Sequence, residues 1–177
     1  SDKILKLMNR KHTIEEYLKI IDRLKKINSS IEFSSDFIIG YPSEDANDFN
    51  QTLNLVRRIK FVNSYSYIFS PRPGTAASKL ELIDKEISSN RLKLIQDELF
   101  KNQKYMNQGI EETIIDVLVE NQTNDKLRLF GRSEYMTPVI FDGNKKNIGK
   151  TIKVKINKSN RNTLFGTAIE SFDKKVA

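Results

Sequence analysis

The sequence predicts a two-part fold, in which an α/β segment is followed by a small all-β barrel. In the first part, helical and strand patterns alternate with short connections, which is typical of parallel strands joined by right-handed crossovers, as in Rossmann-type sheets or barrels. After Gly109 the hydrophobic pattern changes to period two, in five short segments separated by polar turns. Five strands in about 65 residues favour a closed barrel of the oligonucleotide-binding type.

The first part begins with helical signals. Residues 1–8 have a helical pattern, and Thr13 with Glu16 forms a capping box that opens a helix over residues 13–28. Two strands alone are too few for a sheet, so we expect this part to be the second half of a larger α/β unit.

The stretch "SSDFIIGYPSED", residues 34–45, predicts a strand that ends at a Gly-x-Pro turn. Pro42 and Ser43 break this strand and start the next helix, whose apolar stripe is Phe49, Leu53, Val56 and Ile59. A second strand over residues 64–70 and a Pro/Gly loop follow. A long helix is predicted from about Asp84 to Gln108.

Asp36 lies in the middle of the first apolar strand. Strand side chains alternate between faces, so Phe37 and Ile39 share one side while Asp36 and Gly40 share the other. A carboxylate inside a sheet is costly unless it is paired or binds a ligand. We therefore expect Asp36 to be buried and its face of the sheet to carry the functional site.

The five period-two segments cover residues 111–120, 126–135, 137–143, 151–160 and 163–170. No internal repeat is evident. The net charge of +7 equals the charge of one stretch without acidic residues, "GNKKNIGKTIKVKINKSNR", which holds Lys145, Lys146, Lys150, Lys153, Lys155, Lys158 and Arg161. This row predicts contacts with nucleic-acid phosphates, and the alternative is an ordinary solvated face.

Composition excludes several classes of protein. No run approaches the roughly 18 apolar residues of a membrane span, and the N-terminus has no signal-peptide pattern, so we expect a cytoplasmic protein without a membrane partner. The chain has no cysteine, which excludes disulfides, thiolate nucleophiles and cysteine-held metal clusters in this chain. His12 is the only histidine, and we predict no metal site.

Three stretches occur together and in register: "SDKILKLMNRKHTIEEY", "SSDFIIGYPSEDANDF" and "YIFSPRPGTAAS". They resemble the C-terminal part of the partial TIM-type barrel of the radical S-adenosylmethionine (SAM) methylthiotransferases. The residues that follow resemble TRAM, the RNA-binding OB-like barrel of these enzymes. The resemblance implies a radical SAM part over residues 1–108 and a TRAM domain over residues 109–177.

The resemblance implies roles for three residues. In related enzymes, the arginine of an M-N-R-like stretch and the aspartate of an S-x-D-x-I-x-G strand contact the methionine and ribose parts of SAM, which are Arg10 and Asp36 here. Their alternatives are a surface arginine and a backbone-capping carboxylate. Gly40 would let the backbone pass close to the adenine, or would only serve a turn with positive φ. The family often has G-F-P-G-E-T at residues 40–45, from which Ser43 and Asp45 depart.

Further residues are left with two interpretations. Residues 70–75 should lie at the mouth of the barrel, where Arg72 and Thr75 would touch RNA or only shape the loop. Tyr65, Tyr67 and Phe69 would stack on bases or lie in the core.

The stretch "LFGRSEYMTPVIF" is most similar to the tRNA enzyme that methylthiolates C2 of isopentenyladenosine beside the anticodon. This implies tRNA, through its anticodon stem-loop, as the partner. Alternatives are threonylcarbamoyladenosine tRNA or a ribosomal protein as the substrate, and a stand-alone RNA-binding protein.

The family's cluster cysteines have no counterpart in this chain. The two [4Fe-4S] clusters of the full-length enzyme therefore have no ligands here, and we expect no catalytic residue in the chain and no activity from it alone. We expect it to be a C-terminal fragment of a monomeric enzyme, and to self-associate through an exposed strand edge.

Overall fold

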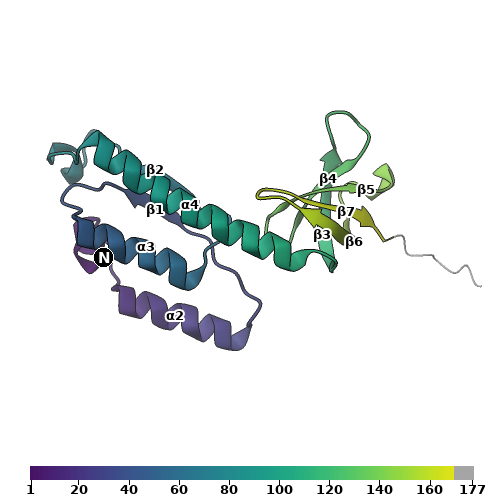
Figure 1. Cartoon of the computed structure of the whole chain (residues 1–177), viewed down its shortest axis with the longest axis horizontal. Helices are drawn as coiled ribbons and strands as arrows, with labels where there is room; N and C mark the ends of the chain where they lie inside the picture. The colour runs from purple at the N-terminus through teal and green to yellow at the C-terminus, as the bar shows by residue number, and fades with distance from the viewer. Residues whose placement is uncertain (170–177) are drawn as a thin grey trace, which may run out of the picture. The chain divides into compact units, whose positions relative to one another are not determined.

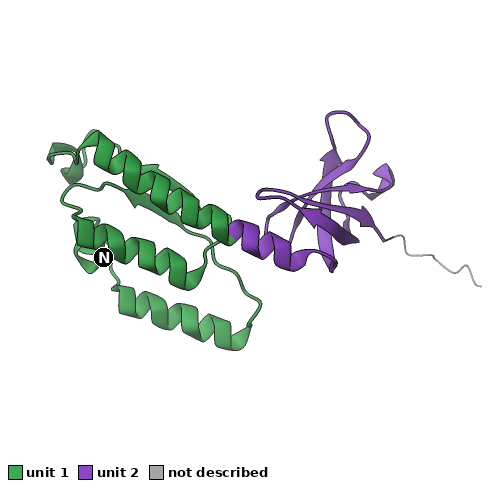
Figure 2. Cartoon of the chain, in the orientation of Figure 1, with its two compact units in different colours: residues 1–102 green, residues 103–177 purple. Residues whose placement is uncertain are grey.

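The computed structural model describes residues 1–169, which form two compact units (Figures 1 and 2). Unit 1 is Ser1–Asn102 and unit 2 begins at Gln103. The division falls within the long helix α4 (Lys85–Ile110). The predicted domain boundary between residues 108 and 109 lies in the same helix and remains a prediction. No helix within residues 1–169 has the length and apolarity needed to cross a membrane.

Unit 1 is the predicted α/β segment. Its strands pair in parallel, with Asp36 opposite Tyr65 and Ile38 opposite Tyr67. In chain order, its elements before α4 are α1 (Asp2–Leu7), α2 (Ile14–Ile27), β1 (Asp36–Ile39), α3 (Ala46–Ile59), β2 (Tyr65–Ile68) and the 3-10 helix η1 (Ala76–Lys79). This confirms the helix and strand order that the sequence predicts.

The core of unit 1 lies on one face of β1. Phe37 and Ile39 pack against apolar residues of the three longer helices, including Ile21 of α2, Val56 of α3 and Ile95 of α4. The alternation of side chains along the strand predicts this face, since the odd-numbered residues point toward the helices. The opposite face of the sheet carries Asp36, Ile38, Tyr65 and Tyr67, all of which are exposed.

The starts of α2 and α3 are fixed by capping boxes. Thr13 and Glu16 cap α2 reciprocally, as the sequence predicts. The start of α3 is later than expected, because Asp45 is its N-cap and exchanges hydrogen bonds with Asp48. Ser43 instead adopts φ +71° in the turn before the helix, a conformation that favours glycine.

Unit 2 contains the closed barrel that the sequence predicts. Its strand order is β3-β4-β5-β7-β6, and β3 pairs with β6 to close the ring. Its elements are β3 (Ile114–Gln122), β4 (Leu129–Ser133), β5 (Pro138–Asp142), the 3-10 helix η2 (Lys145–Asn147), β6 (Thr151–Ser159) and β7 (Leu164–Ala168). Inward-facing Val117, Val139 and Val154, among others, fill the barrel completely.

The barrel contains an internal repeat, so the expectation of none is wrong. Strands β3 and β6 have the same burial pattern and the same bulge position, after Val119 and after Ile156. Each is followed by a Leu-Phe-Gly strand, Leu129–Ser133 or Leu164–Ala168. The repeat is hard to recognise in the sequence because, in the long strands β3 and β6, the inward residues are alike while the outward ones differ.

Candidate functional site

A pocket of about 570 Å³ lies in unit 1 between the α1–α2 segment and β1. Its volume is within the range that binds cofactors and drug-sized ligands. It is lined by residues of α1, α2, β1, α3, β2 and their connections: Ser1, Ile4, Leu5, Met8, Arg10, His12, Ile14, Tyr17, Ser35, Asp36, Phe37, Ile38, Glu44, Thr52, Leu55, Phe61 and Tyr67. About half of these residues have polar side chains, and the others are apolar.

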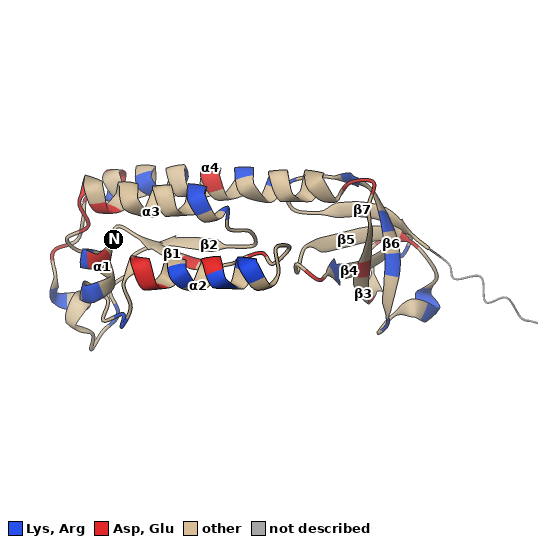
Figure 3. Ribbon diagram, turned by 90° about the horizontal axis from the view of Figure 1, so that it is seen from below, with Lys and Arg blue, Asp and Glu red and all other residues tan. Residues whose placement is uncertain are grey.

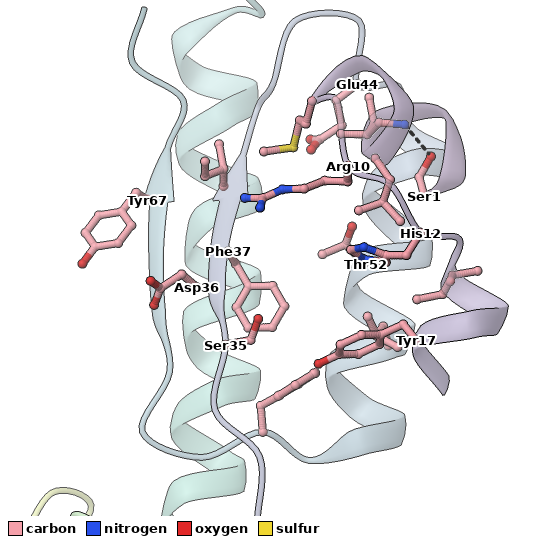
Figure 4. Close-up of a pocket in the computed structure, with 17 residues that line it drawn as sticks. Ser1, Arg10, His12, Tyr17, Ser35, Asp36, Phe37, Glu44, Thr52 and Tyr67 are labelled. Carbon is pink, nitrogen blue, oxygen red and sulfur yellow. Dashed lines mark hydrogen bonds between the residues drawn. The ribbon is translucent and has the colours of Figure 1, made fainter. Parts of the chain in front are cut away.

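The structure places Arg10 and Asp36 on the same pocket (Figure 4). Arg10 extends from the connection between α1 and α2 toward β1, and Asp36 is the first residue of β1. Within residues 1–169, neither side chain has a hydrogen bond or an ion pair. The unpaired guanidinium is free to bind an anionic group of a ligand, and the unpaired carboxylate is free to accept hydrogen bonds from a ligand's donors.

The expectation that Asp36 is buried is wrong. Its side chain is exposed, because β1 pairs only with β2 and no element within residues 1–169 covers this face. Figure 4 shows Asp36 on the opposite side of β1 from Phe37, which packs into the core. The argument that a buried carboxylate needs a ligand therefore does not apply to Asp36. Its position on the pocket is the observation that still favours a binding role.

Gly40 does not line the pocket and lies in the turn after β1. It has φ +70°, and a Cβ atom there would come within 2.6 Å of the Ser88 hydroxyl of α4. Backbone conformation and close packing thus require glycine at this position. Its amide donates to the Glu44 carboxylate over 3.2 Å. Contact of Gly40 with an adenine remains a prediction.

Glu44 and Arg91 form a buried ion pair that sequence reasoning missed. The Arg91 guanidinium donates to the Glu44 carboxylate at 2.8 Å and to its main-chain carbonyl at 3.0 Å. Burial raises the pKa of Glu44, while the hydrogen bonds from Gly40 and Arg91 oppose that rise. The two residues are far apart in the sequence, so no local signal predicts their contact. The pair fixes the turn between β1 and α3 against α4.

The tyrosines of β2 are exposed, so their interpretation as core is wrong. Tyr65 and Tyr67 are 63% and 56% exposed, and their rings stack with centroids 6.5 Å apart. Tyr67 also lines the pocket. Phe69 packs edge-on against Tyr41. In the following loop, the Thr75 hydroxyl donates to the Arg72 carbonyl, which favours a loop-shaping role for Thr75.

The predicted RNA-binding residues lie in unit 2 and are all exposed. Figure 3 shows basic segments along β6. Lys153 is paired with Asp116 at 3.1 Å, and Lys155 with Glu112 at 3.0 Å, so part of their charge is compensated. No such ion pair within residues 1–169 holds Lys145, Lys146, Lys150 or Lys158. The outward direction of the lysines on β6 agrees with the sequence pattern, and their contact with RNA remains a prediction.

The comparisons with known proteins agree with this division of the chain. Residues 1–56 match the model of the radical SAM superfamily, and residues 111–169 match that of the TRAM domain. Three curated relatives are named tRNA-2-methylthio-N(6)-dimethylallyladenosine synthase. They come from Pelagibacter ubique (60% identical over 177 residues), Buchnera aphidicola (45% over 173) and Wolbachia pipientis of Culex pipiens (42% over 171).

The chain corresponds to only part of each of these relatives. The alignments cover 94–100% of the chain, whereas the chain spans only 38–40% of the length of the relatives. The resemblance that the sequence motifs indicate is thereby confirmed for the part that this chain represents, as is the TRAM identity of the five-stranded barrel.

Proposed function

We propose, from the homology of this chain over its whole length to part of the radical SAM tRNA methylthiotransferases, that it supplies the cofactor pocket and the RNA-binding domain of such an enzyme. The substrate we propose is isopentenyladenosine beside the anticodon of tRNA, methylthiolated at C2. The observation that carries the proposal is the 60% identity over all 177 residues to a relative named for this product.

The pocket fits S-adenosylmethionine by its chemistry. The free Arg10 guanidinium suits a bidentate pair with the methionine carboxylate, and the free Asp36 carboxylate suits hydrogen bonds from the ribose hydroxyls. Apolar Met8 and Ile38 supply surface for the remainder of the molecule. When bound and reduced by a cluster, this cofactor supplies the radical that abstracts hydrogen from the substrate. The chain's own residues bind and orient.

The chain does not fit an iron–sulfur cluster by thiolate ligation, because it has no cysteine. In an intact enzyme of this family, both [4Fe-4S] clusters would be held by residues outside this chain. We therefore assign no catalytic residue here. Arg10 and Asp36 are proposed to hold the cofactor, while the basic residues of unit 2 are proposed to hold the anticodon stem-loop. We also propose that the full-length enzyme acts in the cytoplasm, where its proposed tRNA substrate is found, and that it acts as a monomer.

A chimera tests the proposal. This chain would replace the aligned segment of the Pelagibacter ubique relative, and tRNA from a strain without the endogenous enzyme would be analysed by mass spectrometry. The unsubstituted chimera should restore the methylthio product. Asp36→Asn and Arg10→Lys should each reduce the product by at least about tenfold, since a charge-assisted hydrogen bond contributes about 1.5–3 kcal/mol. The matched controls Asp22→Asn and Arg23→Lys, on exposed positions of α2, should have no effect.

Each outcome separates the alternatives. A product on threonylcarbamoyladenosine, or on a ribosomal protein, would change the substrate while retaining the chemistry. Full activity of Asp36→Asn would contradict the cofactor role of this residue. An inactive chimera combined with tight tRNA binding by the chain would favour a stand-alone RNA-binding protein.

A further inference from the structure

Three apolar side chains form a row on the outer face of the barrel in unit 2. Phe130 on β4 is in register with Ile140 on β5, which is in register with Phe165 on β7. All three are partly exposed, and none belongs to the core cluster of the barrel. Their immediate neighbours in each strand point inward instead, as the alternation of strand side chains requires. The row thus forms a continuous apolar strip between polar surroundings.

The two phenylalanines occupy equivalent positions in the internal repeat. Each is the second residue of a Leu-Phe-Gly strand, and each lies opposite the residue at the bulge of the preceding long strand, Asn121 or Lys158. Two inter-strand spacings separate them, or about 10 Å along the row. The repeat therefore presents two similar rings side by side, with Ile140 between them.

A cation accompanies each ring. The Arg132 guanidinium lies 5.8 Å from the centroid of Phe130, and Lys158 is the cross-strand partner of Phe165. Arg132 is also paired with Glu120 at 3.2 Å, whereas Lys158 has no ion pair within residues 1–169. Among residues 103–169, basic residues outnumber acidic ones by eleven to seven. An aromatic strip flanked by cations on a basic domain favours a polyanion with planar, stackable groups.

We propose that Phe130 and Phe165 form a stacking platform for two unpaired nucleobases of single-stranded RNA, with Ile140 as the apolar surface between them. This proposal rests on the proposed RNA binding by unit 2 and assigns it a base-binding site on β4, β5 and β7, beside Lys158 of β6. Lysines attract phosphates without regard to whether the bases are paired. The platform instead requires bases that are free to leave a helix, as in the loop of a hairpin.

Tryptophan substitution gives a direct test, because the chain contains no tryptophan. Phe130→Trp and Phe165→Trp would each introduce a single fluorophore on the platform. A hairpin RNA with an unpaired loop should quench the emission of both variants, since bases stack on the indole. Tyr105→Trp, at an exposed position of α4 outside the barrel strands, is the matched control and should not respond. Unchanged emission of both platform variants, while fluorescence anisotropy shows that they bind the RNA, would overturn the proposal.

Affinity measurements provide the second arm. Phe130→Leu and Phe165→Leu should each weaken hairpin binding by about fivefold or more, because a stacked base contributes about 1–3 kcal/mol. The slope of log affinity against log salt should not change, whereas Lys150→Gln should reduce that slope. A fully paired duplex RNA should bind Phe130→Leu and Phe165→Leu as tightly as it binds the unsubstituted chain, because it offers no free base to stack.

The outcomes distinguish this proposal from the one on which it rests. Absence of RNA binding by the unsubstituted chain would contradict both proposals. Normal hairpin binding by folded Phe130→Leu and Phe165→Leu variants would overturn the platform alone and leave RNA binding intact. A change of oligomeric state in these variants, with RNA affinity unchanged, would identify the strip as a protein contact and would also overturn the proposal.

Discussion

At the scale of single residues, Asp48 shows how a carboxylate is held ionised inside unit 1. Its side chain is almost fully buried and accepts hydrogen bonds from Ser1 Oγ at 2.6 Å, Lys3 Nζ at 2.6 Å and the Asp45 amide at 3.0 Å. Burial alone would raise the pKa of Asp48, but these donors outweigh it and hold the pKa at about 2. The ionised form is thus part of the folded structure.

This pKa predicts an acid-dependent loss of stability. The pKa of Asp48 is lower in the folded chain than its ordinary value of 3.8, so the unfolded chain binds a proton first as the pH falls. The contribution is complete above about pH 4 and is lost as the pH falls toward 2. It should amount to about 1–2 kcal/mol, after allowance for the half-exposed Lys3. Urea unfolding of the chain and of Asp48→Asn should measure it.

Comparing the unsubstituted chain with Asp48→Asn separates the effect of Asp48 from that of the other carboxylates. The difference in free energy of unfolding between them should shrink as the pH is lowered. Asp22→Asn, at an exposed position, serves as the control. A difference that is constant from pH 6 to about pH 2.5 would contradict this assignment.

The turn after β1 contains a second residue-scale prediction. Ser43 and Gly40 have nearly the same positive φ, +71° and +70°. Ser43→Gly should stabilise the chain by about 0.5–1 kcal/mol. Serine is strained in the left-handed conformation, and the relief of this strain should exceed the entropy cost of the more flexible glycine in the unfolded chain. Ser43→Ala should give no such gain. Thermal unfolding followed by circular dichroism would show the difference, and a lower melting temperature for Ser43→Gly would refute it.

Gly40→Ala should act in the opposite direction. It adds strain from positive φ and a contact of 2.6 Å with the Ser88 hydroxyl, and should destabilise unit 1 by about 1–3 kcal/mol. Ser88→Ala should recover only part of this loss, since its own Cβ would remain 3.1 Å from the added methyl group. Full recovery would mean that packing alone, and not backbone conformation, requires this glycine.

At the scale of elements, local signals predicted most of the fold. The capping box of α2, the period-two strands and the Gly-x-Pro turn each depend on residues close in the sequence. The start of α3 was misplaced because Asp45 and Ser43 both resemble N-caps, and only the backbone distinguishes them. The repeat of β3–β4 in β6–β7 is hard to recognise because residue identity is lost at exposed positions of the long strands, where Asp116 corresponds to Lys153, although the burial pattern is the same.

The repeat yields an element-scale prediction about its two glycines. A Cβ on Gly131 would lie 2.3 Å from the Leu118 carbonyl, and one on Gly166 would lie 2.2 Å from the Lys155 carbonyl. Because backbone cannot move aside cheaply, Gly131→Ala and Gly166→Ala should each destabilise the barrel by similar amounts, about 2–4 kcal/mol.

Gly109→Ala is the matched control for this pair. Gly109 lies in α4 with open space around its Cβ position, so alanine there should stabilise by about 0.5–1 kcal/mol. Hydrogen exchange of the barrel amides would compare the three variants. If the barrel tolerates Gly131→Ala but not Gly166→Ala, the two glycines do not have the same structural role in the two halves of the repeat.

At the scale of the whole molecule, the sequence predicted which residues share a face but not what covers that face. Arg10 and Asp36 both line one pocket, and their contact with a cofactor, which the resemblance implied, remains a prediction. The expectation of a buried Asp36 is wrong because burial depends on what packs against that face, no element within residues 1–169 does so, and the pattern of a single strand does not contain that information. The same reasoning explains the tyrosines of β2, whose period-two pattern is equally compatible with core and with surface.

This uncovered face leads to a prediction about self-association. Among the described residues, strand β1 pairs on one edge only, and exposed Ile38, Tyr65, Tyr67 and Ile68 lie on or beside its open face. An unpaired edge next to apolar side chains is a template for strand pairing between copies. We expect the chain to form dimers or larger species as its concentration rises, with sedimentation velocity as the measurement.

A charge on the strand should suppress this association, because like charges repel across a symmetric contact and a buried unpaired lysine is costly. Ile38→Lys should therefore shift the chain toward monomer, by about tenfold or more in the dissociation constant. Ile27→Lys, on an 83% exposed position of α2, introduces the same charge away from the sheet and should have no such effect. Clean monomeric behaviour of the unsubstituted chain at high concentration would contradict the prediction of self-association.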